Sequence, residues 1–208
     1  MGYHRAGFEV VGVDIEDHPT YPFEFHRADA LEFPLDGFDA IHASPPCQSF
    51  TAYRRKGHGV GDGYPDLIAP MRERLQATGL PYVIENVVGA PLEDPVRLCG
   101  STFGLDVRRH RLFESNVPLV APPCEHGWQT PRFPAATNRA PNSRRTVEVG
   151  VWRIPLETQQ RAMGIDWMGL DDLTESIPPD YTEWVGRQLA LAIRRRYSAA
   201  RAAQGLAA

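Results

Sequence analysis

The chain has 208 residues, a length that suits one domain with a small appendage. Hydrophobic residues make up 42% of it, which is ordinary for a globular protein, and no apolar run approaches the roughly 20 residues of a membrane span. The net charge of -4 argues against a general nucleic-acid coat protein, and three cysteines are too few for a disulfide framework. These features exclude a membrane protein, and we expect a protein of the cytoplasm.

The first half of the chain alternates between strand and helix patterns. Apolar, β-branched runs over 8–15, 38–46 and 81–90 predict buried parallel strands. Between the last two, residues 66–80 have helical spacing, and Gly79 is a stop signal. This alternation predicts an α/β fold with a mostly parallel sheet.

The second half has a different organisation. Residues 116–153 are rich in Pro, Asn, Thr and Arg without a sustained period, which predicts an irregular region or a very small subdomain. Helices are expected over 154–165 and 178–204, so the chain divides into segments 1–115, 116–153 and 154–208. The apolar side of the last helix is expected to consist of Val185, Leu189, Leu191 and Ile193.

Reactive side chains follow three of the predicted strands. Asp14, Cys47, Glu85 and Asn86 all fall at carboxyl ends, where parallel sheets bind their ligands. Cys47 follows two prolines and precedes polar residues, so it is either an activated nucleophile or a small buried side chain.

The other two cysteines, Cys99 and Cys124, are expected to be buried apolar groups. Cys124 and His126 could supply two metal ligands, but no second pair stands at metal spacing in the sequence. We therefore expect no metal site.

Several stretches occur together in one order along nearly the whole chain. They are "SPPCQSFT" (44–51), "VIENV" (83–87), "RRHRLFES" (108–115), "IPLETQQRAMGIDWM" (154–168) and "IPPDYTEWVGRQLALAI" (177–193). This series resembles the DNA cytosine-5 methyltransferases. Val107 departs from the family, which usually has Gln there, and the Gly-Asn before the last stretch is absent.

The resemblance implies a Rossmann-like methyltransferase fold and a covalent mechanism on a flipped cytosine. In that mechanism Cys47 adds to carbon 6 of the ring, while Glu85 holds ring nitrogen 3 and the exocyclic amine. Arg111, with Arg109, would neutralise the ring oxygen or a phosphate, and Asn86 would brace the loop that carries Cys47. Segment 1–115 would then be the catalytic core, which 154–208 completes.

The resemblance also implies S-adenosyl-L-methionine as the cofactor. Asp14 would bind the ribose hydroxyls and Asp29 would face the adenine amine, while Ser44 and Pro46 would line the methyl-transfer cavity. The residues implied in cofactor binding are Asp14, Ile15, Asp29, Ala30, Ser44 and Pro46.

Double-stranded DNA is the implied partner, and 116–153 would be a small target-recognition region. We expect a monomer from a bacterium or a phage-infected host cell, with a helper subunit as an alternative because this region is so short. The residues expected to contact DNA are Gln48, Ser49, Arg54, Arg55, Arg132, Arg139, Arg144 and Arg145.

One family feature has no counterpart in the sequence. The family opens with a strand and a Phe-x-Gly-x-Gly-Gly turn that holds the methionine end of the cofactor, whereas this sequence starts beyond that turn. We expect a start codon upstream, and we expect the missing first strand to leave a gap in the middle of the sheet with exposed edges.

Two other functions remain as alternatives. The first is a non-catalytic or truncated DNA-binding relative of the methyltransferases, which the missing glycine turn favours. The second is a cysteine hydrolase, which needs a general-base histidine; His42, His58 and His110 have no evident orienting partner in the sequence.

Overall fold

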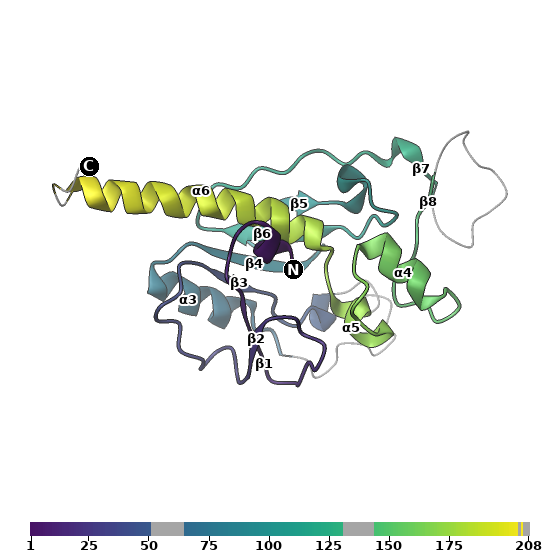
Figure 1. Ribbon diagram of the computed structural model, residues 1–208, viewed down its shortest axis with the longest axis horizontal. Coiled ribbons are helices and arrows are strands. Elements are labelled where there is room, and N and C mark those ends of the chain that lie inside the picture. The colour runs from purple at the N-terminus through teal and green to yellow at the C-terminus, as the bar shows by residue number, and fades with distance from the viewer. Residues whose placement is uncertain (51–64, 131–143, 204, 206–208) are drawn as a thin grey trace.

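The computed structural model describes residues 1–50, 65–130, 144–203 and 205 (Figure 1). It is a mixed α/β fold in which two parallel strands lie apart from a mixed four-stranded sheet. The parallel pair consists of β1 (Val11–Asp14) and β2 (Glu24–Arg27). The larger sheet has the order β3 (Ile41–Ala43), β4 (Tyr82–Val87), β6 (Arg111–Ser115) and β5 (Val96–Leu98).

Only part of the larger sheet is parallel. Strands β3 and β4 are parallel, whereas β6 runs antiparallel to both β4 and β5. The predicted strands are therefore found, each shorter than its apolar run, and the sheet is less parallel than expected. Short pairings of β7 (Gln129–Thr130) and β8 (Arg144–Arg145) lie outside it.

Helices cover both faces of the larger sheet. They are α1 (Gly2–Arg5), α3 (Ile68–Thr78), α4 (Leu156–Met163), α5 (Leu170–Glu175) and α6 (Pro179–Ala203). The described residues also contain three 3-10 turns: η1 (Gln48–Phe50) after β3, η2 (Gly100–Phe103) between β5 and β6, and η3 (His126–Trp128) before β7. As predicted, α3 ends at Gly79, which has a left-handed φ of 64°.

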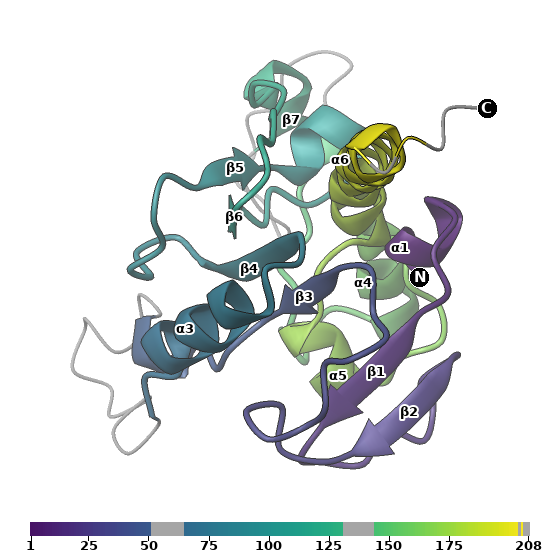
Figure 2. The same cartoon turned by 90° about the vertical axis from the view of Figure 1, so that its left-hand side faces the viewer.

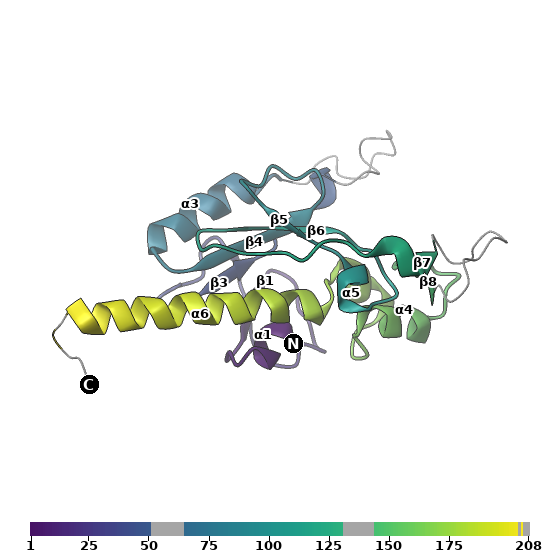
Figure 3. The same ribbon diagram turned by 90° about the horizontal axis from the view of Figure 1, so that it is seen from above.

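Strand β4 divides its side chains between the two faces with the period of two that strands impose. Tyr82 and Ile84 pack against α3, with Met71 and Leu75. Val83 packs on the opposite face in the cluster that contains α6. Figures 2 and 3 show the sheet between α3 on one side and α6 with α1 on the other.

Helix α6 supplies much of the core on its face of the sheet. Tyr181, Val185 and Leu189 are buried against Leu98 and Phe113. The predicted inclusion of Leu191 in this apolar side is wrong. That residue is 54% exposed, because two positions after Leu189 a helix has turned by about 200°.

The two sheets are not joined by hydrogen bonds between strands. Strand β1 pairs only with β2, and β3 pairs with β4, so no ladder links β1 to β3 in the described part of the chain. A break was expected at the middle of the sheet, and here it separates the strand that ends at Asp14 from the strand that precedes Cys47.

Within 116–153 the described residues are mainly loop, with η3, β7 and β8. The start of this region is nevertheless anchored, because Val117, Leu119 and Ala121 pack against the α6 face of the core. None of the described helices combines the length and the apolar character that crossing a bilayer requires.

Close approach of α1 to α6 requires a glycine. A Cβ at Gly2 would lie 2.0 Å from the carbonyl oxygen of Pro179 and 2.6 Å from the backbone nitrogen of Glu183. We predict that Gly2→Ala lowers the free energy of unfolding by about 1–3 kcal/mol, because backbone atoms cannot yield as a side chain can. Urea unfolding measures this. Gly169→Ala, which places its Cβ in open space, is the control, and equal losses in both would contradict the prediction.

Candidate active site

The loop that carries Cys47 is fixed to the neighbouring strand by a side chain. Asn86 Nδ2 donates to the carbonyl oxygen of Pro45 at 2.9 Å, and Asn86 Oδ1 accepts from the backbone N–H of Val87 at 2.9 Å. Asn86 is buried, so no water competes for these bonds. This is the bracing contact expected of Asn86.

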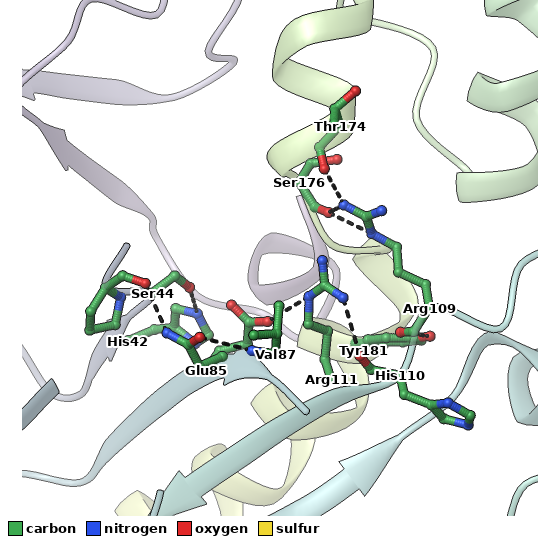
Figure 4. Close-up of polar contacts among 12 residues, drawn as sticks. His42, Ser44, Glu85, Val87, Arg109, His110, Arg111, Thr174, Ser176 and Tyr181 are labelled. Atoms are coloured by element: carbon green, nitrogen blue, oxygen red, sulfur yellow. Dashed lines mark hydrogen bonds and ion pairs between the residues drawn. The ribbon is translucent and has the colours of Figure 1, made fainter. Parts of the chain in front are cut away.

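Glu85 and Arg111 face each other across β4 and β6. Glu85 lies opposite Phe113 in the antiparallel ladder, which makes Arg111 its diagonal neighbour on the same face. Arg111 Nε is 3.1 Å from Glu85 Oε1, and both side chains are almost buried (Figure 4). The sequence placed the two residues at one site, and the structure joins them as an ion pair.

The environment of Glu85 favours its acid form. Burial raises the pKa of this carboxyl group, although Arg111, a hydrogen bond from Ser44 and the charge of Arg109 all act to lower it. Oε1 contacts Arg111 as an ion pair but has no hydrogen-bond partner among the described residues. A ligand that offers both an acceptor and an N–H group suits such a carboxyl group.

A chain of hydrogen bonds leads to Glu85 from the N-terminal helix. Tyr3 Oη lies 2.7 Å from His42 Nδ1, and His42 Nε2 lies 2.9 Å from Ser44 Oγ. Burial lowers the pKa of His42 to about 4, so its imidazole is neutral near pH 7. Burial also raises the pKa of Tyr3, so its phenol keeps its proton and donates it to His42 Nδ1. The proton of the imidazole is then on Nε2, which donates to the Ser44 hydroxyl, and that hydroxyl donates to Glu85.

Sequence reasoning missed this chain. His42 and Ser44 stand two positions apart on and just beyond β3, so a period of two puts them on one face. This period of two in the sequence could have identified His42 and Ser44 as neighbours on one face. Tyr3 carried none, because only the packing of α1 against α6 and the sheet brings it to His42.

Cys47 is half-buried, and its surroundings do not activate the thiol in the free protein. Burial raises the pKa of Cys47, and Arg111, which favours the thiolate, does not offset this effect. Arg54 and Arg55, which were expected to contact DNA, lie outside the described residues. The thiol of the free protein is therefore protonated at neutral pH.

The side chain of Arg109 is directed toward the end of α5. Its Nε and Nη2 donate to the carbonyl oxygen of Ser176 at 2.9 and 2.6 Å, and Nη2 donates to that of Thr174 at 2.5 Å. Figure 4 shows its guanidinium turned toward α5, away from Glu85. Its donors satisfy carbonyl groups at the end of a helix, while its charge still acts on Glu85, so neutralisation of a ring oxygen or a phosphate by Arg109 stays a prediction.

A cavity of about 510 Å³ opens between β1 and β3. All six predicted cofactor residues line it, and Gln48, predicted to contact DNA, lines it as well. Asp14 Oδ1 accepts the backbone N–H of Glu16, and Ile15 at the rim is 65% exposed. An exposed apolar side chain next to a carboxylate suits a flat, hydroxylated ligand.

The predicted DNA contacts are only partly described. Ser49 is buried in η1, so its side chain is not presented on an outer surface, contrary to the prediction. Arg132 and Arg139, like Arg54 and Arg55, lie outside the described residues. Arg144 and Arg145 form β8, which pairs with β7, and only their backbone is described.

The hydrolase alternative finds no support at Cys47. In the described ranges no histidine hydrogen-bonds to this thiol, and His42 is held between Tyr3 and Ser44. The chain matches no protein-family model and none of the curated proteins with which it was compared. Its function must therefore be inferred from the residues and their geometry.

We predict that Asn86→Ala frees the Cys47 loop, because the carbonyl of Pro45 loses its donor. Alkylation of Cys47 by iodoacetamide, followed by peptide mass spectrometry, should become several-fold faster. Asn116→Ala is the matched control. Asn116 hydrogen-bonds the backbone of Leu80 and Tyr82, at the opposite end of β4 from Asn86. If both variants accelerate alkylation equally, the effect is global destabilisation and the brace is refuted.

We predict that His42 stays neutral, with its proton on Nε2, down to about pH 5. The unfolded state binds a proton near pH 6.5 and the folded state only near pH 4, so this residue costs stability as pH falls through that window. The contribution of the neutral His42 to the free energy of unfolding is fully present above pH 6.5. Ring nitrogen NMR shifts over a pH series check this; a ring that titrates near 6.5 would contradict it.

Proposed function

We propose that the chain is a DNA cytosine-5 methyltransferase with a Rossmann-like fold. One observation carries the proposal: Cys47 lies between Pro46 and Gln48, which line the cavity of the six residues expected to bind the cofactor, and the charges of Glu85 and Arg111 both act on its thiol. The residues come from three separated stretches of sequence, and a common packing role does not explain a buried carboxyl group beside a thiol. The break between β1 and β3 also lies where the resemblance places the absent strand.

Glu85 has the properties that the base needs. A carboxyl group with a raised pKa can donate a proton to ring nitrogen 3 of cytosine and accept a hydrogen bond from the exocyclic amine. Arg111 beside it stabilises the carboxylate that remains after the proton is given. The chain from Tyr3 through His42 to Ser44 fixes the orientation of this carboxyl group.

Cys47 is the proposed nucleophile. Its sulfur forms a bond to carbon 6 while the ring takes the proton at nitrogen 3, and carbon 5 becomes nucleophilic. Because burial disfavours the thiolate, the thiol must give its proton to a water molecule as the base binds, and the charge of Arg111 assists. After carbon 5 takes the methyl group, its own proton leaves to water, the carbon–sulfur bond breaks to release the Cys47 thiolate, and ring nitrogen 3 returns its proton to Glu85.

The cavity fits part of the cofactor. When bound, S-adenosyl-L-methionine supplies the methyl group. The Asp14 carboxylate suits the ribose hydroxyls, and Asp29 and Ile15 suit the adenine amine and ring. The volume is within the range of about 300–1,000 Å³ usual for ligand sites. The sequence offers no glycine turn for the methionine end.

The second candidate is a non-catalytic DNA-binding relative. One observation favours it: burial raises the pKa of Cys47. A covalent adduct distinguishes the two candidates, because only the enzyme forms one.

We predict that duplex DNA containing 5-fluorocytosine traps the protein when methyl donor is present, since fluorine cannot leave carbon 5 as a cation. Duplex containing pyrimidin-2-one tests the thiol separately. The pyrimidin-2-one ring lacks the exocyclic amine and is more electrophilic at carbon 6. It therefore forms the adduct with the thiol without a methyl donor. The adduct should survive denaturing electrophoresis and map to the peptide around Cys47.

Three variants complete this experiment. Cys47→Ser should form no adduct, and Glu85→Gln should slow it about a hundredfold or more through loss of the acid. Glu114→Gln is the matched control, because Glu114 is equally buried but pairs with Arg72 on the opposite face of the sheet. Absence of adduct on both DNAs, with DNA binding retained, would establish the non-catalytic relative instead.

A further inference from the structure

A second cluster of reactive side chains lies outside the proposed active site. Cys99 directly follows β5 and His110 directly precedes β6, whereas Cys124 lies in the loop before η3 and His126 is the first residue of η3. Each offers one ligand atom, and these four atoms all lie within 4.8 Å of one another. Cys99 is buried, and the other three are half-buried.

The distances are those of a tetrahedral metal site. Cys99 Sγ lies 3.2 Å from His126 Nε2, and Cys124 Sγ lies 3.4 Å from His110 Nε2. In a tetrahedron with zinc bonds of about 2.3 Å to sulfur and 2.0–2.1 Å to nitrogen, neighbouring ligand atoms are about 3.3–3.8 Å apart. The four side chains therefore need only small movements to surround one ion.

The surroundings of the cluster also suit a metal. Ser101 Oγ lies 3.0 Å from Cys99 Sγ and accepts the backbone N–H of Glu125 at 3.0 Å, so its own proton is free to point at the sulfur. Such a donor from outside the ligand set fixes a thiolate in position.

We infer that Cys99, His110, Cys124 and His126 form a structural zinc site. Two thiolates and two neutral imidazoles make a closed, four-coordinate set with no open position for catalysis, which is the usual pattern of structural zinc. This inference does not depend on the proposed methyltransferase activity, and it replaces the expectation from the sequence that no metal site exists.

The site would join three segments, of which the two that flank β5 and β6 are already linked by the ladder between these strands. It links the start of segment 116–153 to the ends of β5 and β6, next to the hydrogen bond from Thr102 Oγ1 to the carbonyl of Pro123. His110 also stands between Arg109 and Arg111 in the chain. Zinc bound here would fix the end of the strand that presents Arg111 to Glu85.

The test begins with the full chain, expressed with zinc and purified without a histidine tag. Elemental analysis should find about one zinc per chain. Replacement of zinc by cobalt should give the intense visible bands of a tetrahedral site and a sulfur-to-cobalt charge-transfer band. A folded protein that holds no zinc and takes up no cobalt would refute the site, as would a Cys99–Cys124 disulfide in the freshly purified chain.

Variants identify the ligands. Cys124→Ser and His126→Ala should each lose stoichiometric zinc, and Ser101→Ala should weaken zinc binding about tenfold in competition with a chromophoric chelator. Cys47→Ser and His26→Ala are the controls and should retain the ion, because neither residue belongs to the cluster. If Cys124→Ser or His126→Ala retains full zinc content, the ligand assignment is wrong. If both variants fail to fold, the cobalt spectrum of the unaltered chain decides.

Discussion

Strand β4 pairs with β3 on one side and with β6 on the other, and the candidate active site is built across these two ladders. The parallel register that sets His42 beside Val83 puts His42 and Ser44 on the same face as Glu85. The antiparallel register with β6 puts Arg111 on that face as well. A slip of one residue in either ladder would send these side chains to opposite faces. The site therefore depends on a register that is itself fixed by burial of the strand on both faces.

Burial has opposite consequences for stability and for chemistry. A carboxyl group enclosed next to Arg111 costs desolvation energy, and removal of one partner from such a pair typically destabilises a protein by about 3–5 kcal/mol. The same burial raises the pKa of Glu85 and of Cys47 above their ordinary values. A protein that needed only a stable core would do equally well with apolar side chains here. The carboxyl group is more easily understood as an acid held ready for a ligand.

The parts around the site serve as supports. Arg109 ties the loop before β6 to the end of α5, and Tyr181 Oη donates to the carbonyl oxygens of Arg108 and Arg109 from α6. Arg109 has a φ of 34°, a left-handed conformation that is strained for a residue with a side chain. These contacts hold the strained residue and so fix the start of β6. The cluster of cysteines and histidines includes His110, the residue directly after Arg109, and so contacts the same segment before β6.

The sequence by itself determined strands β1, β3 and β4, helices α3, α4 and α6, and the identity of the residues at the proposed active site, whereas strands β2, β5 and β6 were not predicted. Apolar runs and glycine stop signals depend on local backbone preferences, so β4, α3 and α6 could be predicted from them. Cys47, Glu85, Asn86 and Arg111 stand in recognisable stretches, and reactive residues at strand ends converge on one edge of a sheet.

Only the tertiary structure decided which neighbours these residues have. The direction of the Arg109 side chain, the contact of Tyr3 with His42 and the gathering of Cys99 with His126 all join segments far apart in the chain. The pKa of Cys47 is raised because packing removes water from the thiol, an effect that no local pattern encodes. Residue types and their periods are local properties of a sequence, whereas burial and side-chain partners depend on how distant segments pack.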